Sequence, residues 1–194
     1  MSTYRVTDVA NYFVDYYSRS VDPVNLPRVQ LFVYFAQAES LCRFGRPLFD
    51  DRFIAYTSGP AIARLNDYYN EAGNMPISVY GKYDPKVFSF EDAQLLMDVA
   101  VYYNKFSTTE LQLMTYAKGA PWEQVYSNPN EMAYIDNSLI LEYYLSKARI
   151  PSYYDVMLEK INDCCALTGE DFVEGMMPET SVFCRASTVS PTWE

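Results

Sequence analysis

The sequence predicts a mainly α-helical fold, a compact single-domain bundle of about six to seven helices around a central apolar helix. Three observations predict it. Apolar residues recur at three- and four-residue spacing through most of the chain, as in amphipathic helices. Residues 28–44 are apolar on nearly every side, as in a helix surrounded by others. Alternation typical of strands is confined to residues 75–88, where we expect a short strand or hairpin.

Two helices are predicted in the first part of the chain. Residues 6–18 place their apolar side chains on one stripe, and Asp22-Pro23 breaks that pattern. Residues 28–44 form the central helix. Gly45 is expected to end it, because glycine readily takes the left-handed conformation found at helix C-termini.

Gly59-Pro60 is interpreted as a turn followed by a helix start. Proline suits the first helical turn because its missing N–H would have no partner there. This third helix is expected to end near Gly73. The helix that follows Ser107 is expected to end at Gly119. Pro121-Trp122 just beyond it is interpreted as a helix stop followed by a large core anchor, because proline cannot continue a helix.

The later helices carry recognisable N-terminal caps. Ser89 is expected to cap one helix, and Ser107 with Glu110 forms the spacing of a capping box before another. Two more helices are predicted at about residues 138–148 and 152–166. We therefore assign residues 1–166 to one helical domain and residues 167–194 to a partly mobile C-terminal extension.

The composition excludes several classes of function. The 194-residue chain has a formal net charge of −10 and no histidine, which removes Ser-His-Asp and Cys-His catalysis and imidazole zinc sites. A pI near 4.5 argues against direct nucleic-acid binding and indicates either a surface that faces water or a basic protein partner. The sequence has no apolar run long enough for a transmembrane helix and no signal-peptide pattern, so we expect no membrane association and a cytoplasmic location.

The remaining reactive residues do not form a recognisable site. Cys42, Cys164, Cys165 and Cys184 lack Cys-x-x-Cys spacing, and the last three have the wrong spacing for zinc. The neighbouring carboxylates Asp50 and Asp51 are interpreted as solvated caps. Because the chain also lacks the glycine-rich nucleotide motifs, we expect no catalytic, cofactor or metal site. Hydrolysis by Asp50, Asp51 or Cys164 stays as the enzymatic alternative.

Tyrosine is unusually frequent. The chain has 19 tyrosines, and ten of them form adjacent pairs at residues 16–17, 68–69, 102–103, 143–144 and 153–154. Adjacent helical residues cannot both face the core, so one of each pair should lie at the boundary or outside. Two interpretations remain open: packing with the hydroxyl toward water, or an aromatic surface that binds a partner.

Three sequence blocks resemble the Panacea antitoxin domain family, which includes SocA-like antitoxins. Residues 29–37 read VQLFVYFAQ, where the family pattern is L-Q-K-L-L-Y-[YF]-A-Q. GRPLF at residues 45–49 with IAYTSGP at 54–60, and the block from Glu110 to Trp122, resemble two further family blocks. The resemblance covers roughly residues 5–150. Its motif positions, which we expect to hold the fold or to contact a toxin, are Gln30, Tyr34, Gln37, Gly59, Pro60, Thr115, Tyr116, Pro121 and Trp122.

The chain departs from the family pattern at three positions. Leu31 stands where the family has lysine, Tyr56 where it has tryptophan, and Tyr116 where it has histidine. Leu31 and Tyr116 thus stand in place of a lysine and a histidine, and both replacements are compatible with packing.

The resemblance implies a non-enzymatic antitoxin that binds and neutralises a toxin encoded by an adjacent gene. Two alternatives follow from the same resemblance. The protein would act as an adaptor that delivers the toxin to a AAA+ protease, through the segment after Thr168, or as a phage or mobile-element interaction protein without a toxin.

Overall fold

The computed structural model describes residues 4–18, 23–73, 75–77, 83–126 and 132–168. The chain divides into two units, residues 1–150 and residues 151–194. The second unit contains helix α8 (Tyr153–Thr168), close to the predicted helix at 152–166. The extension predicted at 167–194 lies almost wholly outside the described residues, so the boundary after residue 166 stays a prediction.

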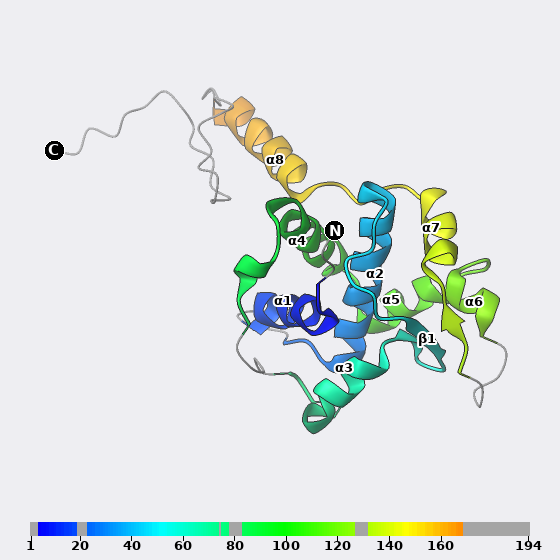
Figure 1. Ribbon diagram of the computed structural model, residues 1–194. Coiled ribbons are helices and arrows are strands. Elements are labelled where there is room, and N and C mark those ends of the chain that lie inside the picture. Colours follow the sequence, from blue (N-terminus) through cyan, green and yellow to red (C-terminus); the bar gives the residue numbers. More distant parts are fainter. Residues whose placement is uncertain (1–3, 19–22, 74, 78–82, 127–131, 169–194) are drawn as a thin grey trace. The chain divides into compact units, whose positions relative to one another are not determined.

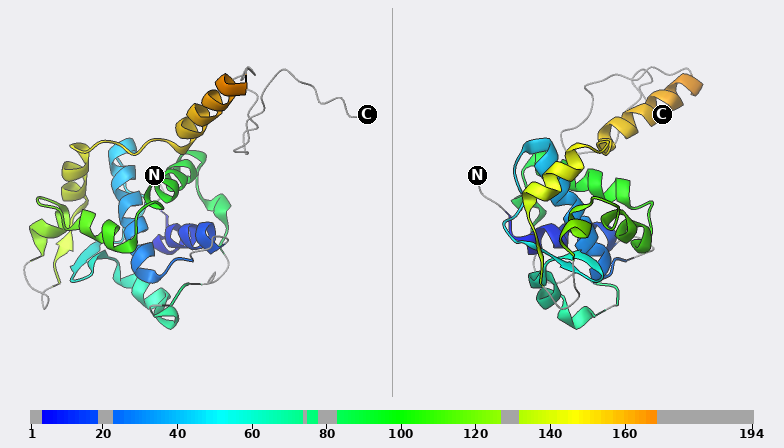
Figure 2. Two further views of the ribbon diagram at one scale, coloured as in Figure 1. Left: turned by 180° about the vertical axis from the view of Figure 1, so that it is seen from behind. Right: turned by 90° about the vertical axis from the view of Figure 1, so that its right-hand side faces the viewer.

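Helix α2 (Leu26–Phe44) is the centre of the first unit, as predicted. Asn25 caps it by accepting a hydrogen bond from the Arg28 N–H, and Gly45 ends it in the left-handed conformation with φ of 65°. Its residues 29–41 are all buried. Seen from the front and from behind, α1 and α4 lie on one side of α2, and the sheet, α6 and α7 lie on the other (Figures 1 and 2).

The surrounding helices follow from local sequence. Ser89 caps α4 by accepting the Asp92 N–H, and Ser107 and Glu110 form the reciprocal capping box before α5, which confirms both predicted starts. No helix in the described ranges is both long and apolar enough to cross a membrane. The bounds are α1 (Val6–Ser18), α3 (Ala63–Tyr68), α4 (Phe90–Tyr103), α5 (Thr108–Thr115), α6 (Pro121–Val125) and α7 (Asn137–Leu145).

A small antiparallel sheet has the strand order β2-β1-β3. It consists of β1 (Phe53–Tyr56), β2 (Gly59–Ala61) and β3 (Tyr134–Ile135). In the described part of 75–88, where a strand or hairpin was expected, Pro85–Val87 forms a 3₁₀ turn, and residues 78–82 lie outside the described residues. The sheet lies elsewhere in the chain. The sequence does not reveal it because β1 is almost wholly buried, and a buried strand lacks the alternation of polar and apolar residues that marks a half-exposed one.

Gly59 and Pro60 belong to β2, so the helix start predicted at Pro60 is wrong, and α3 begins at Ala63. Pro60 lies opposite Ala55, whose N–H donates instead to Ala133 O at 2.8 Å on the other side of β1. Opposite residues in an antiparallel sheet alternate between hydrogen-bonded and non-hydrogen-bonded pairs. Ala55 and Pro60 form a pair of the second kind, so β1 requires no N–H from Pro60.

Pro121 is likewise at a helix start rather than a helix stop. It lies in the first turn of α6, and α5 has already ended at Thr115, before the end predicted at Gly119. The missing N–H of proline has no cost in a first helical turn. Trp122 is half-buried and packs against the core, as an anchor would.

Buried ion pairs fix the ends of α2 and α4. Arg43 contacts Asp98 (2.5 Å) and Glu39 (3.1 Å) and donates to Ile150 O at 3.3 Å. The Asp98 side chain is fully enclosed. Burial raises the pKa of Glu39, and the Arg43 charge opposes that shift only in part.

Candidate functional site at the β1–β2 hairpin

The turn between β1 and β2 is held by side chains from two helices. Tyr56 pairs with Gly59, so the turn itself has only two residues, Thr57 and Ser58. Three successive main-chain carbonyls here each accept one side-chain hydrogen bond. The donors to Tyr56, Thr57 and Ser58 are Trp122 Nε1 (2.8 Å), Tyr116 Oη (2.8 Å) and Gln112 Nε2 (2.5 Å), respectively. Helices α5 and α6 therefore fix the backbone of the hairpin.

Aromatic rings cover the same region. The Trp122 ring centroid lies 4.2 Å from that of Tyr116 and 4.3 Å from that of Tyr126, with which it is stacked. All three rings are half-buried, and Leu113, one turn before Tyr116 on α5, is 61% exposed. We call this the hairpin surface and define it as Thr57, Ser58, Leu113, Tyr116, Trp122 and Tyr126.

Gly59 is favoured by the backbone conformation at the start of β2. Its φ of 111° is unfavourable for other residues, and a Cβ there would lie 3.5 Å from Thr115 Oγ1 and 3.9 Å from Tyr116 Cε1. Thr115 is buried, and its hydroxyl donates to Gln112 O at 2.8 Å. The motif positions Gly59 and Thr115 therefore lie next to each other where β2 packs against α5.

Gln30 and Gln37 are buried on α2 and hold the main chain of distant segments. Gln30 Oε1 accepts the Ile62 N–H at 2.9 Å, and its Nε2 donates to Ile62 O and to Asn66 Oδ1 at 3.0 Å each. Gln37 Oε1 accepts the Leu48 N–H at 2.9 Å, and its Nε2 donates to Phe49 O at 3.2 Å. Seven residues separate the two glutamines, so they lie on one face of the helix two turns apart. Both stabilise the fold.

Tyr34 is fully buried in an aromatic cluster with Phe53 and Tyr144. Burial raises the pKa of Tyr34 and of Tyr144 well above the ordinary tyrosine value. Both hydroxyls therefore keep their protons near neutral pH, and Tyr34 has a structural role.

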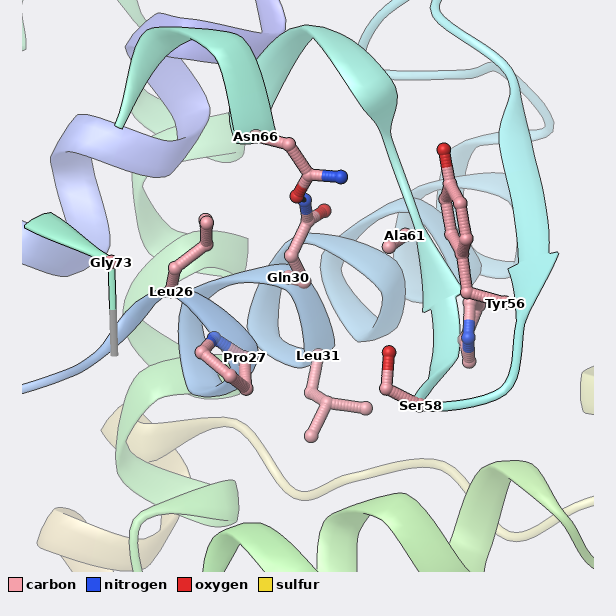
Figure 3. A pocket seen from close by; sticks show the side chains of 10 residues that line it. Leu26, Pro27, Gln30, Leu31, Tyr56, Ser58, Ala61, Asn66 and Gly73 are labelled. Atoms are coloured by element: carbon pink, nitrogen blue, oxygen red, sulfur yellow. Dashed lines mark hydrogen bonds between the residues drawn. The ribbon is translucent and has the colours of Figure 1, made fainter. Parts of the chain in front are cut away.

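A cavity of about 240 Å³ lies between the first half of α2 and the hairpin (Figure 3). The amides of Gln30 and Asn66 meet on one side of it, and the Tyr56 ring stands on the other. Its lining has no charged residue and includes Leu31 and Tyr56, two of the positions that depart from the family pattern. The volume is below the ~300–1,000 Å³ of typical small-molecule sites, so the cavity suits a partner's side chain better than a free ligand.

The structure brings six of the predicted motif residues together at the hairpin: Gly59, Pro60, Thr115, Tyr116, Pro121 and Trp122. Gln30 reaches the end of β2 from α2, whereas Tyr34 and Gln37 lie in the core. The prediction missed Gln112, Leu113 and Tyr126. Helical spacing gave a signal, because Gln112 precedes Tyr116 by four residues and Tyr126 follows Trp122 by four.

Of the residues considered for catalysis, the structure describes the side chains of Asp50 and Asp51 but not that of Cys164. Asp51 is half-buried and makes an ion pair with the exposed Arg64 at 3.3 Å. Burial raises the pKa of the Cys42 thiol, which disfavours the reactive thiolate. Cys184 and the side chains of Cys164 and Cys165 lie outside the described residues. In the part of the chain that the structure describes, no three Cys, Asp or Glu side chains gather as a metal site would require.

Comparison with known proteins gives one family. Residues 30–123 match the family model described as antitoxin SocA-like, Panacea domain. The matched segment is shorter than the 5–150 span of the resemblance, but it contains all nine motif positions. No match was found among curated proteins or among solved structures.

Proposed function

We propose that this chain, whose residues 30–123 match the SocA-like Panacea antitoxin domain, is an antitoxin that neutralises a cognate toxin by direct protein binding. The family match is the observation that carries the proposal. The action is non-enzymatic and takes place in the cytoplasm, and the partner is a toxin protein encoded by an adjacent gene.

The hairpin surface is the proposed toxin-binding surface. Five of its six residues lie within the matched segment, Tyr126 being the exception. Half-exposed aromatic rings beside an exposed leucine have the composition of an interface core. The three carbonyl hydrogen bonds hold this surface in one conformation before a partner binds, which lowers the entropic cost of association.

The charge of the protein supports a basic partner. A net charge of −10 accelerates association with a positively charged toxin, and salt screens this attraction. We therefore expect the association rate to fall as salt concentration rises. An association rate that does not change with salt removes the electrostatic part of the proposal and leaves the antitoxin role in place.

The experiment is a rescue test in cells. The adjacent open reading frame is induced with and without this protein, and colonies are counted. We expect growth arrest that this protein relieves. Leu113→Asp places a charge in the hairpin surface and should abolish the rescue. Phe90→Asp is the matched control, because Phe90 is 73% exposed on α4 and lies outside the hairpin surface.

Two outcomes overturn the proposal. A harmless neighbouring protein, or an arrest that this protein cannot relieve, removes the antitoxin role. A rescue by Leu113→Asp equal to that of the unchanged protein removes the hairpin surface as the binding site. Repeating the test in cells without AAA+ proteases distinguishes blocking, which persists there, from delivery to a protease, which is lost.

A further inference from the structure

A second cavity, of about 460 Å³, lies at the opposite end of α5 from the hairpin. It forms where the first turn of α2, the C-terminal end of α4 and the first turn of α5 meet. Its volume is within the range of about 300–1,000 Å³ typical of small-molecule sites. Its lining consists of Pro23, Asn25, Arg28, Asn104, Lys105, Phe106, Ser107 and Thr108.

The charged residues in this lining, Arg28 and Lys105, are both cationic. The Arg28 guanidinium is positioned by hydrogen bonds to Asn104 O (3.3 Å) and Thr108 Oγ1 (3.4 Å) and by the Phe32 ring below it (5.1 Å). Lys105 Nζ lies 4.0 Å from the centroid of the Tyr102 ring. This cavity thus has two cationic side chains in its lining, and no carboxylate lies among the lining residues that the structure describes, in a chain whose net charge is −10.

The carboxylate of Glu110 lies near this cavity but does not line it. Its oxygen accepts hydrogen bonds from the Ser107 N–H and the Ser107 hydroxyl, both at 2.7 Å, as the capping box requires. The peptide dipoles of α2 and α5 direct the positive ends of both helices toward the cavity. The two cationic side chains and these helix ends give the cavity a positive potential.

We propose that this cavity binds the phosphate group of a small anionic molecule. A guanidinium, an ammonium and the Thr108 hydroxyl supply donors from several directions, which suits the tetrahedral arrangement of phosphate oxygens. The Phe106 ring and Pro23 supply apolar surface for the rest of the ligand. This site is distinct from the hairpin surface and does not depend on the proposed toxin.

The test uses the full chain labelled with ¹⁵N, titrated with sodium pyrophosphate at constant ionic strength and followed by amide chemical shifts. We expect saturable shifts centred on residues 105–109, with a dissociation constant of about 1 mM or below. Lys105→Gln should weaken binding at least about fivefold, because it removes one of the two cations. Lys86→Gln and Lys118→Gln remove the same charge from exposed lysines outside the cavity and should leave the dissociation constant unchanged.

Three results overturn the proposal. Shifts that do not saturate exclude a specific site. An unchanged dissociation constant in Lys105→Gln places the binding elsewhere. Citrate that binds as tightly as pyrophosphate at matched ionic strength excludes selectivity for phosphate. Because Lys105 is exposed, its replacement by glutamine is not expected to unfold the protein.

Discussion

The buried face of α2 and the hairpin surface contain residues of the same family motifs, but they use them differently. On α2, Gln30 and Gln37 are enclosed and bind the main chain of segments far away in sequence. At the hairpin, Tyr116 and Trp122 also bind main-chain oxygens, yet their rings remain half-exposed. A sequence motif therefore marks two kinds of residue. Substitution of the first kind should reduce stability, and substitution of the second kind should chiefly reduce binding.

The largest loss of stability is expected from Arg43→Met. This change leaves the fully enclosed Asp98 carboxylate without its closest cation, and breaking such a buried pair costs about 3–5 kcal/mol. Arg52→Met is the control, because Arg52 and Asp136 form an exposed pair and exposed pairs contribute about 0–1 kcal/mol. Urea unfolding measures both free energies. Equal losses in the two variants would contradict the assignment of Arg43 to the buried scaffold.

Gln37→Met should reduce the free energy of unfolding by about 2–3 kcal/mol. It leaves the Leu48 N–H and the Phe49 carbonyl without partners in the core, at a cost of about 1–3 kcal/mol for each buried group. Gln30→Met should cost a similar amount, because it likewise leaves the N–H and the carbonyl of the buried Ile62 without partners. Urea unfolding of both variants measures these losses, and a loss below about 1 kcal/mol in either variant would contradict its role in the buried scaffold.

Asp92→Asn should change how stability depends on pH. Burial raises the pKa of Asp92, but hydrogen bonds from Tyr4, Arg46 and Ser89 and the Arg46 charge outweigh burial, so the pKa lies below its usual value of 3.8. A depressed pKa stabilises the fold above pH 3.8, and that stabilisation is lost as the pH falls through the lower, folded-state value.

Asp92→Asn should therefore be less stable than the unchanged protein at pH 7, by about 1–3 kcal/mol, and should lose less stability on acidification. Unfolding measured from pH 7 to pH 2 tests both expectations. Asp136→Asn is the control, because the Asp136–Arg52 pair is exposed. If Asp92→Asn lost as much stability between pH 7 and pH 2 as the unchanged protein does, this role of Asp92 would be refuted.

The smallest effect on stability is expected at the hairpin surface. Tyr116→Phe removes the hydrogen bond to Thr57 O and should cost about 0.5–1.5 kcal/mol, while weakening the toxin complex about fivefold or more. Tyr134→Phe removes a hydroxyl from an exposed tyrosine outside the hairpin surface and is the matched control. Unfolding and toxin titration are measured together. Destabilisation by more than about 3 kcal/mol with unchanged affinity would place Tyr116 with the buried scaffold.

The helices were predictable because their signals are local. Ser89, the Ser107–Glu110 capping box and Gly45 each act within a few residues, and each was located correctly from the sequence. Helical geometry also predicted correctly that one tyrosine of an adjacent pair is buried and the other is not. Tyr17 and Tyr69 are buried, whereas their neighbours Tyr16 and Tyr68 are exposed.

The sheet was not predictable because its partners are distant in sequence. Phe53 pairs with Ile135, more than eighty residues away. Pro60 fits a helix start and an edge strand equally well. The strand forms because the Ala55 N–H donates its hydrogen bond to the distant Ala133 carbonyl on the other side of β1. The site was predictable as a set of motif residues, but the sequence did not indicate that α5 and α6 bind the main chain of residues 56–58.

The three hydrogen bonds to the hairpin turn bear on how far this loop can vary. Every amino acid has a main-chain carbonyl, so residues 57 and 58 can change identity and still accept the bonds from Tyr116 and Gln112. The side chains of Thr57 and Ser58 are both exposed, and thus changes there alter what a partner meets without loosening the turn. A fold built in this way can acquire new recognition at one loop while its scaffold remains the same.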